Sequence, residues 1–222
     1  MDIDSWDLRR ALDAVLFAVN EESEFPILRG VHLDIHDGVA AFVTTDQFRL
    51  AVAEVKVHSA LTVSAVVPVT FARLLRDVAG VVTLTFSART VTASYPGGEV
   101  SSPLIEDGEF PDHRILREHH NAVELSGDHL AALLNGTEDS AVVSVGEDGG
   151  ARVDPGGTDP REKFRVLVDR QRLRDAAAAQ PGRQLVIRVS GATLPLAIRT
   201  GDCVGYYSYL MPLQPVGEKA FT

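Results

Sequence analysis

The side chains that could do chemistry gather in residues 107–120, where acids and histidines alternate with turn residues. Asp112, His113, His119 and His120 form the one histidine-rich group, and imidazole and carboxylate are both ligands of zinc. Adjacent residues of an extended segment point to opposite sides, so His119 and His120 are poorly placed to hold one ion. We interpret the stretch as a surface linker and expect no metal site.

Paired carboxylates are the second chemistry that this stretch suggests. Asp107, Glu109 and Asp112 lie close together in sequence, as a pair that works by acid–base catalysis would require. Gly108 and Pro111 among them are typical of a turn, however. The sequence also contains neither a G-x-S-x-G nucleophile elbow nor an H-E-x-x-H zinc motif. We therefore predict a protein that is not an enzyme and that uses no cofactor.

Two glycine-rich segments, residues 146–150 and 154–160, are the remaining candidates for a chemical site. Neither resembles the phosphate-binding pattern G-x-x-x-x-G-K-[ST], and neither leads from a strand into a helix. We interpret both as surface loops.

The end of the chain is unusually apolar. Residues 206–213 read Tyr-Tyr-Ser-Tyr-Leu-Met-Pro-Leu, whereas most chains end in a polar tail. This pattern predicts a buried strand that runs into a Met-Pro-Leu tip, where Pro212 cannot donate a main-chain hydrogen bond.

Composition limits the remaining classes. The chain has 222 residues and a net charge of −10, so a globally basic surface for nucleic acid is absent. Cys203 is the only cysteine, which excludes an intrachain disulfide and fits a reducing compartment. The acidic N-terminus has no apolar segment of a leader behind it, and no run is long enough to span a membrane. We expect a cytoplasmic protein.

Periodicity in the first half predicts two amphipathic helices, over residues 6–19 and 69–78. Asp4 or Ser5 is the expected cap of the first helix. The expected inner stripe of the second is Phe71, Leu74, Leu75 and Val78. Short apolar runs predict strands over residues 31–35, 39–44, 50–57, 61–67, 81–86, 90–95 and 100–105.

The second half repeats this order of elements, which predicts two tandem domains of similar fold, residues 1–118 and 119–222. Helices are expected at 128–135 and near Leu173, and strands at 122–125, 185–189 and 194–198. In this alignment Val168 and Leu173 match Val69 and Leu74. The first domain has only residues 1–3 where the second has a strand, as if it were cut at a domain edge.

Four motifs in this order resemble the bacterial DNA polymerase III beta sliding clamp family, in particular its second and third domains. They are residues 25–31 (its P-I-L-x-G-V), 45–51 (T-D-x-x-R-L-A), 107–112 (G-x-F-P-D) and 209–213 (Y-x-x-M-P). The resemblance spans nearly the whole chain. It implies an α+β fold of two clamp-like domains, each a curved antiparallel sheet with two helices on one face.

The resemblance also implies a pocket between the two domains that binds linear peptides of other proteins. By correspondence of motifs its residues would be Leu28, Thr45, Gln47, Phe48, Arg49, Leu50, Met211, Pro212 and Leu213. Each leucine is equally typical of a plain core, and Asp46 with Arg49 of a turn ion pair. Gln47 and Phe48 replace the Gly-His that is frequent in the family, Gln214 replaces a basic residue, and residues 215–222 extend beyond the usual end.

In that family the inner helices contact the phosphates of duplex DNA. The corresponding cations here would be Arg9, Arg10, Arg73, Arg76, Arg170, Arg172 and Arg174, while the third helix offers only His129. Exposed arginines are also common on ordinary amphipathic helices. A family chain has three domains, so two-domain chains would need three copies to complete a six-domain ring.

Two functions remain open at this stage. The first is a non-catalytic sliding-clamp-like protein of replication or repair, which recruits partner peptides, self-associates as a dimer or trimer and contacts duplex DNA. The second is a clamp-derived module for regulation or oligomerisation in a MerR-type transcription regulator.

Overall fold

The computed structural model describes residues 1–116, 122–126, 130, 139–145, 151–154, 164–181, 184–201 and 205–213. The chain divides into two compact units. Unit 1 comprises Met1–His113 with Val204–Tyr206, and unit 2 comprises Arg114–Cys203 with Tyr207–Thr222. The domain boundary predicted between residues 118 and 119 lies outside the described residues and stays a prediction.

Helix α1 (Ser5–Val15) begins where the sequence predicts, because the side chain of Asp4 caps it. The Trp6 N–H donates to Asp4 Oδ1 at 2.8 Å, which satisfies one of the free N–H groups of the first turn. The helix buries its apolar stripe, including Leu8 and Leu12, and ends in a short 3₁₀ turn, η1 (Leu16–Ala18). The predicted helix is thus confirmed.

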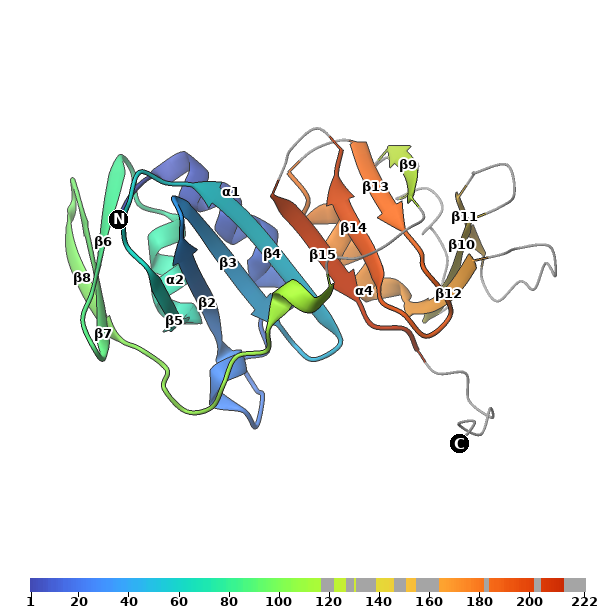
Figure 1. Cartoon of the computed structure of the whole chain (residues 1–222), viewed down its shortest axis with the longest axis horizontal. Helices are drawn as coiled ribbons and strands as arrows, with labels where there is room; N and C mark the ends of the chain where they lie inside the picture. Colours follow the sequence, from blue (N-terminus) through green and yellow to red (C-terminus); the bar gives the residue numbers. More distant parts are fainter. Residues whose placement is uncertain are drawn as a thin grey trace. The chain divides into compact units, whose positions relative to one another are not determined.

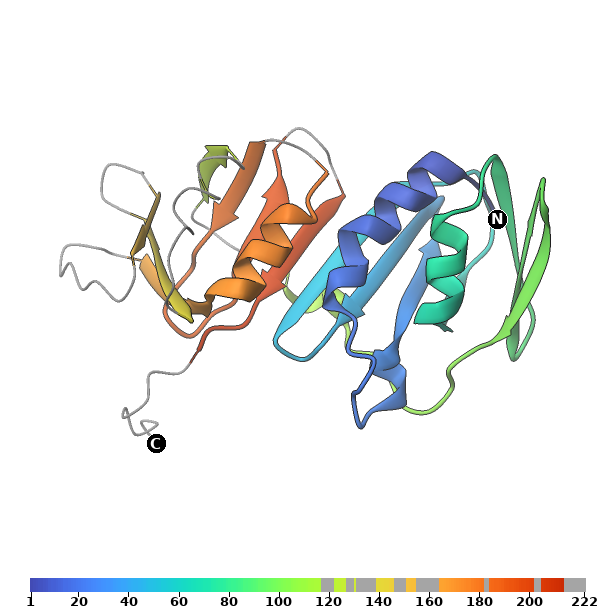
Figure 2. The ribbon, with the colours of Figure 1, turned by 180° about the vertical axis from the view of Figure 1, so that it is seen from behind.

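Helix α2 (Val69–Arg76) follows Pro68 directly and lies beside α1 on one face of the sheet (Figure 2). It buries Val69, Phe71, Ala72 and Leu75. The predicted stripe is wrong at Leu74, whose exposed fraction is 44%. Successive residues of a helix are turned by about 100°, so with Leu75 facing the core Leu74 is turned away.

The strands of unit 1 form two antiparallel groups (Figure 1). The first has the order β5-β2-β3-β4 and the second the order β1-β6-β7-β8. Their bounds are β1 (Asp2–Asp4), β2 (Gly30–His36), β3 (Val39–Thr45), β4 (Arg49–Lys56), β5 (Val63–Pro68), β6 (Val81–Phe86), β7 (Thr90–Tyr95) and β8 (Gly98–Pro103). Another short 3₁₀ helix, η2 (Pro26–Arg29), precedes β2.

Two local features concern the turn between β2 and β3 and the start of the chain. Asp37 and Gly38 have φ of 51° and 75°, the left-handed conformation of the two-residue hairpin turn predicted between β2 and β3. The short strand β1 pairs with β6, with Ile3 opposite Val82. Residues 1–3 therefore take part in a sheet.

Unit 2 contains one sheet of order β15-β14-β13-β9 and another of order β11-β10-β12. The bounds are β9 (Ala122–Ser126), β10 (Ser140–Val145), β11 (Ala151–Asp154), β12 (Phe164–Asp169), β13 (Gln184–Arg188), β14 (Leu196–Thr200) and β15 (Tyr206–Leu210). All described strand pairs of the unit are antiparallel. A 3₁₀ turn, η3 (His113–Leu116), lies where the two units join in sequence. Of the predicted helix at 128–135 only Leu130 is described, and it is helical and buried. The predicted loops at 146–150 and 155–160 fall outside the described residues.

Helix α4 (Arg170–Ala178) follows β12 as α2 follows β5, which supports the predicted repeat of elements. The alignment of the two helices needs correction, because Val168 lies in β12 and α4 begins 101 residues after α2. Leu173, which is fully buried, therefore corresponds to the buried Ala72 and not to Leu74. With strands and helices in both units, the chain has the predicted α+β fold class.

The apolar end of the chain forms the predicted strand, β15. It pairs with β14, with Leu210 opposite Leu196, and Tyr209 and Leu210 are buried. Beyond the strand, the Leu213 N–H donates to the Leu167 carbonyl at 2.8 Å. These contacts within unit 2 explain why the segment is apolar.

Candidate partner-binding site and helix surface

Five of the nine predicted pocket residues lie together in the turn that joins β3 to β4. Thr45 and Leu50 face each other as the last pair of the ladder. The four residues between them close the turn through Asp46, whose N–H donates to the Arg49 carbonyl at 3.2 Å. Asp46 Oδ1 accepts from the main-chain N–H groups of Phe48 at 3.0 Å and Arg49 at 2.8 Å. One carboxylate therefore organises the turn.

The side chains of Asp46 and Arg49 form an ion pair inside this turn. Arg49 Nε lies 2.8 Å from Asp46 Oδ2, and the two side chains are 14% and 13% exposed. The guanidinium also lies 5.1 Å from the centre of the Phe17 ring, within the range of a cation–π contact. Arg49 is thus held by the protein itself, as the turn ion pair envisaged from the sequence requires.

Gln47 has an unusual backbone in the turn. Its φ is 76°, in the left-handed region that favours glycine, and its N–H donates to Thr45 Oγ1 at 3.1 Å. A residue other than glycine costs about 1–2 kcal/mol in this conformation. The turn therefore accepts strain at the position before Phe48.

Phe48 is the exposed apolar residue of the turn. Its exposed fraction is 50%, whereas Thr45 and Leu50 are 6% and 7% exposed. A half-exposed aromatic ring on a closed, hydrogen-bonded turn offers apolar contact area with little backbone freedom to lose on binding. It is the residue of this group best placed to contact another molecule.

Leu28, the remaining predicted residue from unit 1, is buried. It is 4% exposed in a cluster with Ile27 and Val66, against which Ile105 and Phe110 pack. The alternative of plain core fits Leu28 better than that of an exposed pocket wall.

The last three predicted residues follow β15 in unit 2. Met211 is 44% exposed, and Pro212 and Leu213 are partly buried. The main-chain bond from Leu213 to Leu167 fixes the end of this segment. Unit 1 and unit 2 thus each carry an exposed apolar side chain from the predicted set, and their meeting in one pocket stays a prediction.

The arginines of α1 and α2 have partners within unit 1. The Arg73 guanidinium binds the Glu21 carboxylate, with Nη1 to Oε2 at 3.0 Å, and Arg76 Nε donates to Asp13. Asp13 raises the pKa of Arg76 through this hydrogen bond and through its charge. Arg9 donates from Nε to the Arg76 carbonyl at 2.9 Å, and its Nη2 lies 3.5 Å from Asp77 Oδ1.

Arg10 is engaged differently. Its guanidinium lies 4.3 Å from the centre of the Trp6 ring and 5.4 Å from that of Tyr206. Trp6 is 60% exposed, so the pair forms a surface patch on α1 that the sequence reasoning did not single out. The four-residue spacing on one helix face was the available signal.

On α4 the three predicted cations differ in exposure. Arg170 is 3% exposed, and its Nη2 donates to the Ser140 carbonyl at 3.3 Å. We therefore remove Arg170 from the set of residues expected to face DNA, because its side chain lies under the surface. Arg172 and Arg174 are partly exposed.

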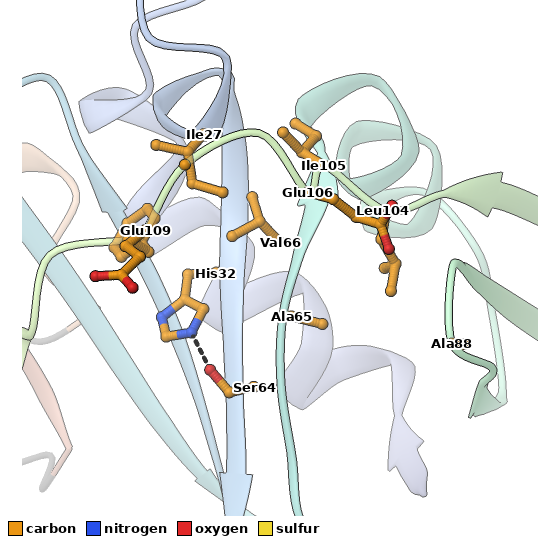
Figure 3. A pocket seen from close by; sticks show the side chains of 12 residues that line it. Ile27, His32, Ser64, Ala65, Val66, Ala88, Leu104, Ile105, Glu106 and Glu109 are labelled. Atoms are coloured by element: carbon orange, nitrogen blue, oxygen red, sulfur yellow. Dashed lines mark hydrogen bonds between the residues drawn. The ribbon is translucent and has the colours of Figure 1, made fainter.

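A cleft of about 460 Å³ in unit 1 was not predicted. It lies beside β5 and contains His32, whose Nε2 is 2.9 Å from Ser64 Oγ (Figure 3). The signal was present in β2, where His32, Asp34 and His36 alternate with Leu33 and Ile35 and so define a polar face.

Neither a metal cluster nor a membrane helix is found in the part of the chain that the structure describes. No group of three or more metal-binding side chains comes together there. Among the same residues, no helix is long and apolar enough to cross a membrane. His119 and His120 lie outside the described residues.

Comparison with protein families gives a match over half of the chain. Residues 2–112 match the family described as "DNA polymerase III beta subunit, central domain". Among curated proteins, the beta sliding clamp of Treponema pallidum (strain Nichols) is 34% identical over 121 residues, covering 51% of this chain and 32% of the clamp. The chain therefore spans about a third of the length of that relative.

Solved structures share the fold over nearly the whole chain. The DNA polymerase III beta subunit of Thermotoga maritima has a TM-score of 0.81 at 18% identity, covering 97% of this chain and 65% of that one. A sliding clamp of Bartonella birtlesii, solved bound to griselimycin, has a TM-score of 0.79 at 18% identity, covering 97% and 66%. This chain thus spans slightly less than two thirds of these clamps, and at such identity the likeness shows the fold alone.

Proposed function

Because the chain belongs to the DNA polymerase III beta subunit family, we propose that it is a non-catalytic, sliding-clamp-like protein that recruits partners through linear peptides. The proposed contact surface is the β3–β4 turn around Phe48 together with Met211, Pro212 and Leu213. The observation that supports it most directly is the half exposure of Phe48 on a turn closed by Asp46.

The chemistry of this surface suits an apolar peptide. Phe48 offers a rigid ring, and Met211, at 44% exposure, offers a flexible thioether side chain that adapts to different partners. Because Arg49 is already paired with Asp46, we assign it to supporting the turn and not to binding a peptide carboxylate. The proposed ligand is therefore recognised mainly by apolar side chains and main-chain hydrogen bonds.

The experiment is a fluorescence anisotropy titration with a labelled peptide from the clamp-binding segment of a replicative polymerase. Phe48→Ala and Met211→Ala should each weaken binding about tenfold, as expected for anchor residues that become buried when the peptide binds. Phe25 and Leu194, exposed at 57% and 48%, supply matched controls in which Ala should leave the affinity within about twofold. Equal losses for test and control variants, or none, would refute the proposed surface.

We further propose that the chain self-associates and that α1 and α2 contact duplex DNA weakly. The intramolecular pairing of Arg73 and Arg76 with acids leaves little net positive charge for phosphates. Light scattering at micromolar concentration tests association, and a monomer would exclude a ring. Retention on closed circular plasmid but not on linear plasmid would support encirclement, whereas equal, salt-sensitive binding to both would contradict it.

The same pairing favours a second candidate, a regulatory or oligomerisation module of a MerR-type transcription regulator. Such a module would keep the clamp-like fold and have no need of a cationic helix surface. It predicts a defined oligomer that binds neither form of plasmid and does not bind the polymerase peptide. Peptide binding that depends on Phe48 would rule against it.

A further inference from the structure

The cleft in unit 1 lies where the segment after β8 crosses the sheet, and we name it the outer cleft. Its lining includes Ile27, His32, Ser64, Val66, Glu106 and Glu109, and its volume of about 460 Å³ lies within the range of ligand pockets. Val31 and Leu33 pack with the residues of α1 and α2. Because side chains alternate along a strand, His32 faces the opposite side of the sheet. The outer cleft is thus on the face away from the helices.

One side of the outer cleft is the edge of a sheet. Within unit 1, β5 is the last strand of its group, and the Ile105 N–H donates to the Val66 carbonyl at 2.8 Å in an isolated antiparallel bridge. Main-chain groups of alternate residues point to the same side of a strand. The N–H and C=O of Ser64 therefore point to the same outer edge as those of Val66.

The crossing segment leaves this edge immediately after the bridge. Gly108, with φ of 106°, allows a turn that brings Phe110 onto the His32 ring, with ring centres 4.7 Å apart. Figure 3 shows the segment arching from Ile105 towards Glu109 beside β2 and β5. The main-chain groups at Ser64 thus lie next to the outer cleft and beyond the reach of the single bridge.

The polar groups of the outer cleft are suited to an extended peptide. His32 Nε2 and Ser64 Oγ are joined at 2.9 Å and provide a fixed polar floor beside the edge. Apolar side chains such as Ile27 and Val66 join these groups in the lining. A strand that added to β5 would find main-chain partners and both polar and apolar side-chain contacts.

Charge indicates what kind of peptide would bind. The charged residues among those that line the outer cleft are Glu106 and Glu109, both acidic. Arg89 lies 3.7 Å from Glu106, but its side chain is 83% exposed, so this pair contributes little and a ligand cation can replace it. The lining therefore complements a basic peptide.

We propose that the outer cleft binds an extended basic segment of a partner protein, which adds to β5 as an antiparallel or parallel strand. This site is separate from the surface around Phe48, and the proposal does not depend on that one. The two sites would let one chain hold two partner segments at once.

The probe is a fluorescein-labelled eight-residue peptide of alternating lysine and valine, titrated by anisotropy and followed by amide chemical shifts of the ¹⁵N-labelled chain. The peptide should shift the amides of Ser64 and Val66 most strongly. A peptide of the same length and charge in which two central valines are replaced by proline should bind at least about fivefold more weakly, because proline lacks the N–H that pairs with a strand.

Variants of the chain separate the main-chain contact from the charges. Ser64→Pro removes the outward N–H at an edge position that tolerates proline, and it should weaken binding about five- to tenfold. Ser64→Ala keeps that N–H and loses only the hydroxyl of the polar floor, so it should weaken binding less than Ser64→Pro does. Glu109→Gln should weaken binding about two- to fivefold, whereas Glu99→Gln on β8, outside the outer cleft, should not.

Several results would overturn the proposal. These are equal binding of the two peptides, equal loss for Glu109→Gln and Glu99→Gln, or shifts centred away from β5. Concentration-dependent shifts of Ser64 and Val66 without any peptide would identify a second copy of the chain as the occupant and would also overturn it. If Ser64→Pro fails to fold, the proline-containing peptide and the two glutamine variants decide the question.

Discussion

In both the β3–β4 turn and the α1–α2 surface, arginines pair with acids of the same unit, but the two regions leave different kinds of group exposed. In the turn, Asp46 holds two main-chain N–H groups and Arg49, and an apolar ring is left at the surface. On the helix surface, Asp13 pairs with Arg76 and Glu21 pairs with Arg73, so the surface carries ion pairs with little net charge. Internal pairing therefore strengthens the case for a peptide site at the turn and weakens that for a strong DNA site on the helices.

Removal of the carboxylate that organises the turn should have the largest effect on stability. Asp46→Ala leaves two main-chain N–H groups and the mostly buried Arg49 guanidinium without their acceptor, so we expect a loss of about 2–3 kcal/mol. Urea denaturation of the whole chain measures it. Glu24→Ala, at an exposed position outside the turn, should cost less than about 0.5 kcal/mol, and equal costs would contradict the role given to Asp46.

Removal of the acids that pair with the helix arginines should increase DNA binding by the α1–α2 surface. In the double variant Asp13→Asn with Glu21→Gln, Arg76 and Arg73 lose their acidic partners and become available to phosphates. We expect DNA affinity at low salt to rise about tenfold and the salt dependence to steepen by up to about two phosphate contacts. Asp2→Asn with Glu22→Gln makes the same change in net charge elsewhere. An equal gain in that control would show that overall charge, and not pairing, limits DNA binding.

Relief of backbone strain in the turn should have the smallest effect. Gln47→Gly removes the left-handed strain, and the greater freedom of glycine in the unfolded chain offsets part of the gain. We expect stability to rise by up to about 1 kcal/mol, measured by thermal or urea unfolding. Gln47→Ala, which keeps a Cβ, should give no gain. A glycine variant less stable than the alanine variant would contradict the claim that the backbone at Gln47 is strained.

The sequence was sufficient to predict the elements that have strong local signals. The Asp4 cap, the Asp37-Gly38 hairpin and the apolar strand at Tyr206–Leu210 depend on neighbouring residues, and each is where the pattern predicts. The error at Leu74 arose because Val69, Phe71, Ala72 and Leu75 fill the buried stripe of α2, and the apolar pattern alone does not say that Leu74 lies outside it.

Features that depend on distant residues could not be predicted. Arg73 and Arg76 are 52 and 63 residues away from their acidic partners, so the sequence showed cations and not ion pairs. The burial of Leu28 and the outer cleft both depend on Ile105 and Phe110, which reach β2 and β5 from the end of unit 1. Only the structure reveals how that segment crosses the sheet.

The most direct test of the account compares Phe48→Ala with Phe25→Ala in the titration of the labelled polymerase peptide. Both changes remove an exposed phenyl ring from unit 1, so their effects on surface hydrophobicity are alike. We predict that Phe48→Ala raises the dissociation constant about tenfold while Phe25→Ala leaves it within about twofold. A dissociation constant that is the same for both variants would contradict the claim that the β3–β4 turn is where partners bind.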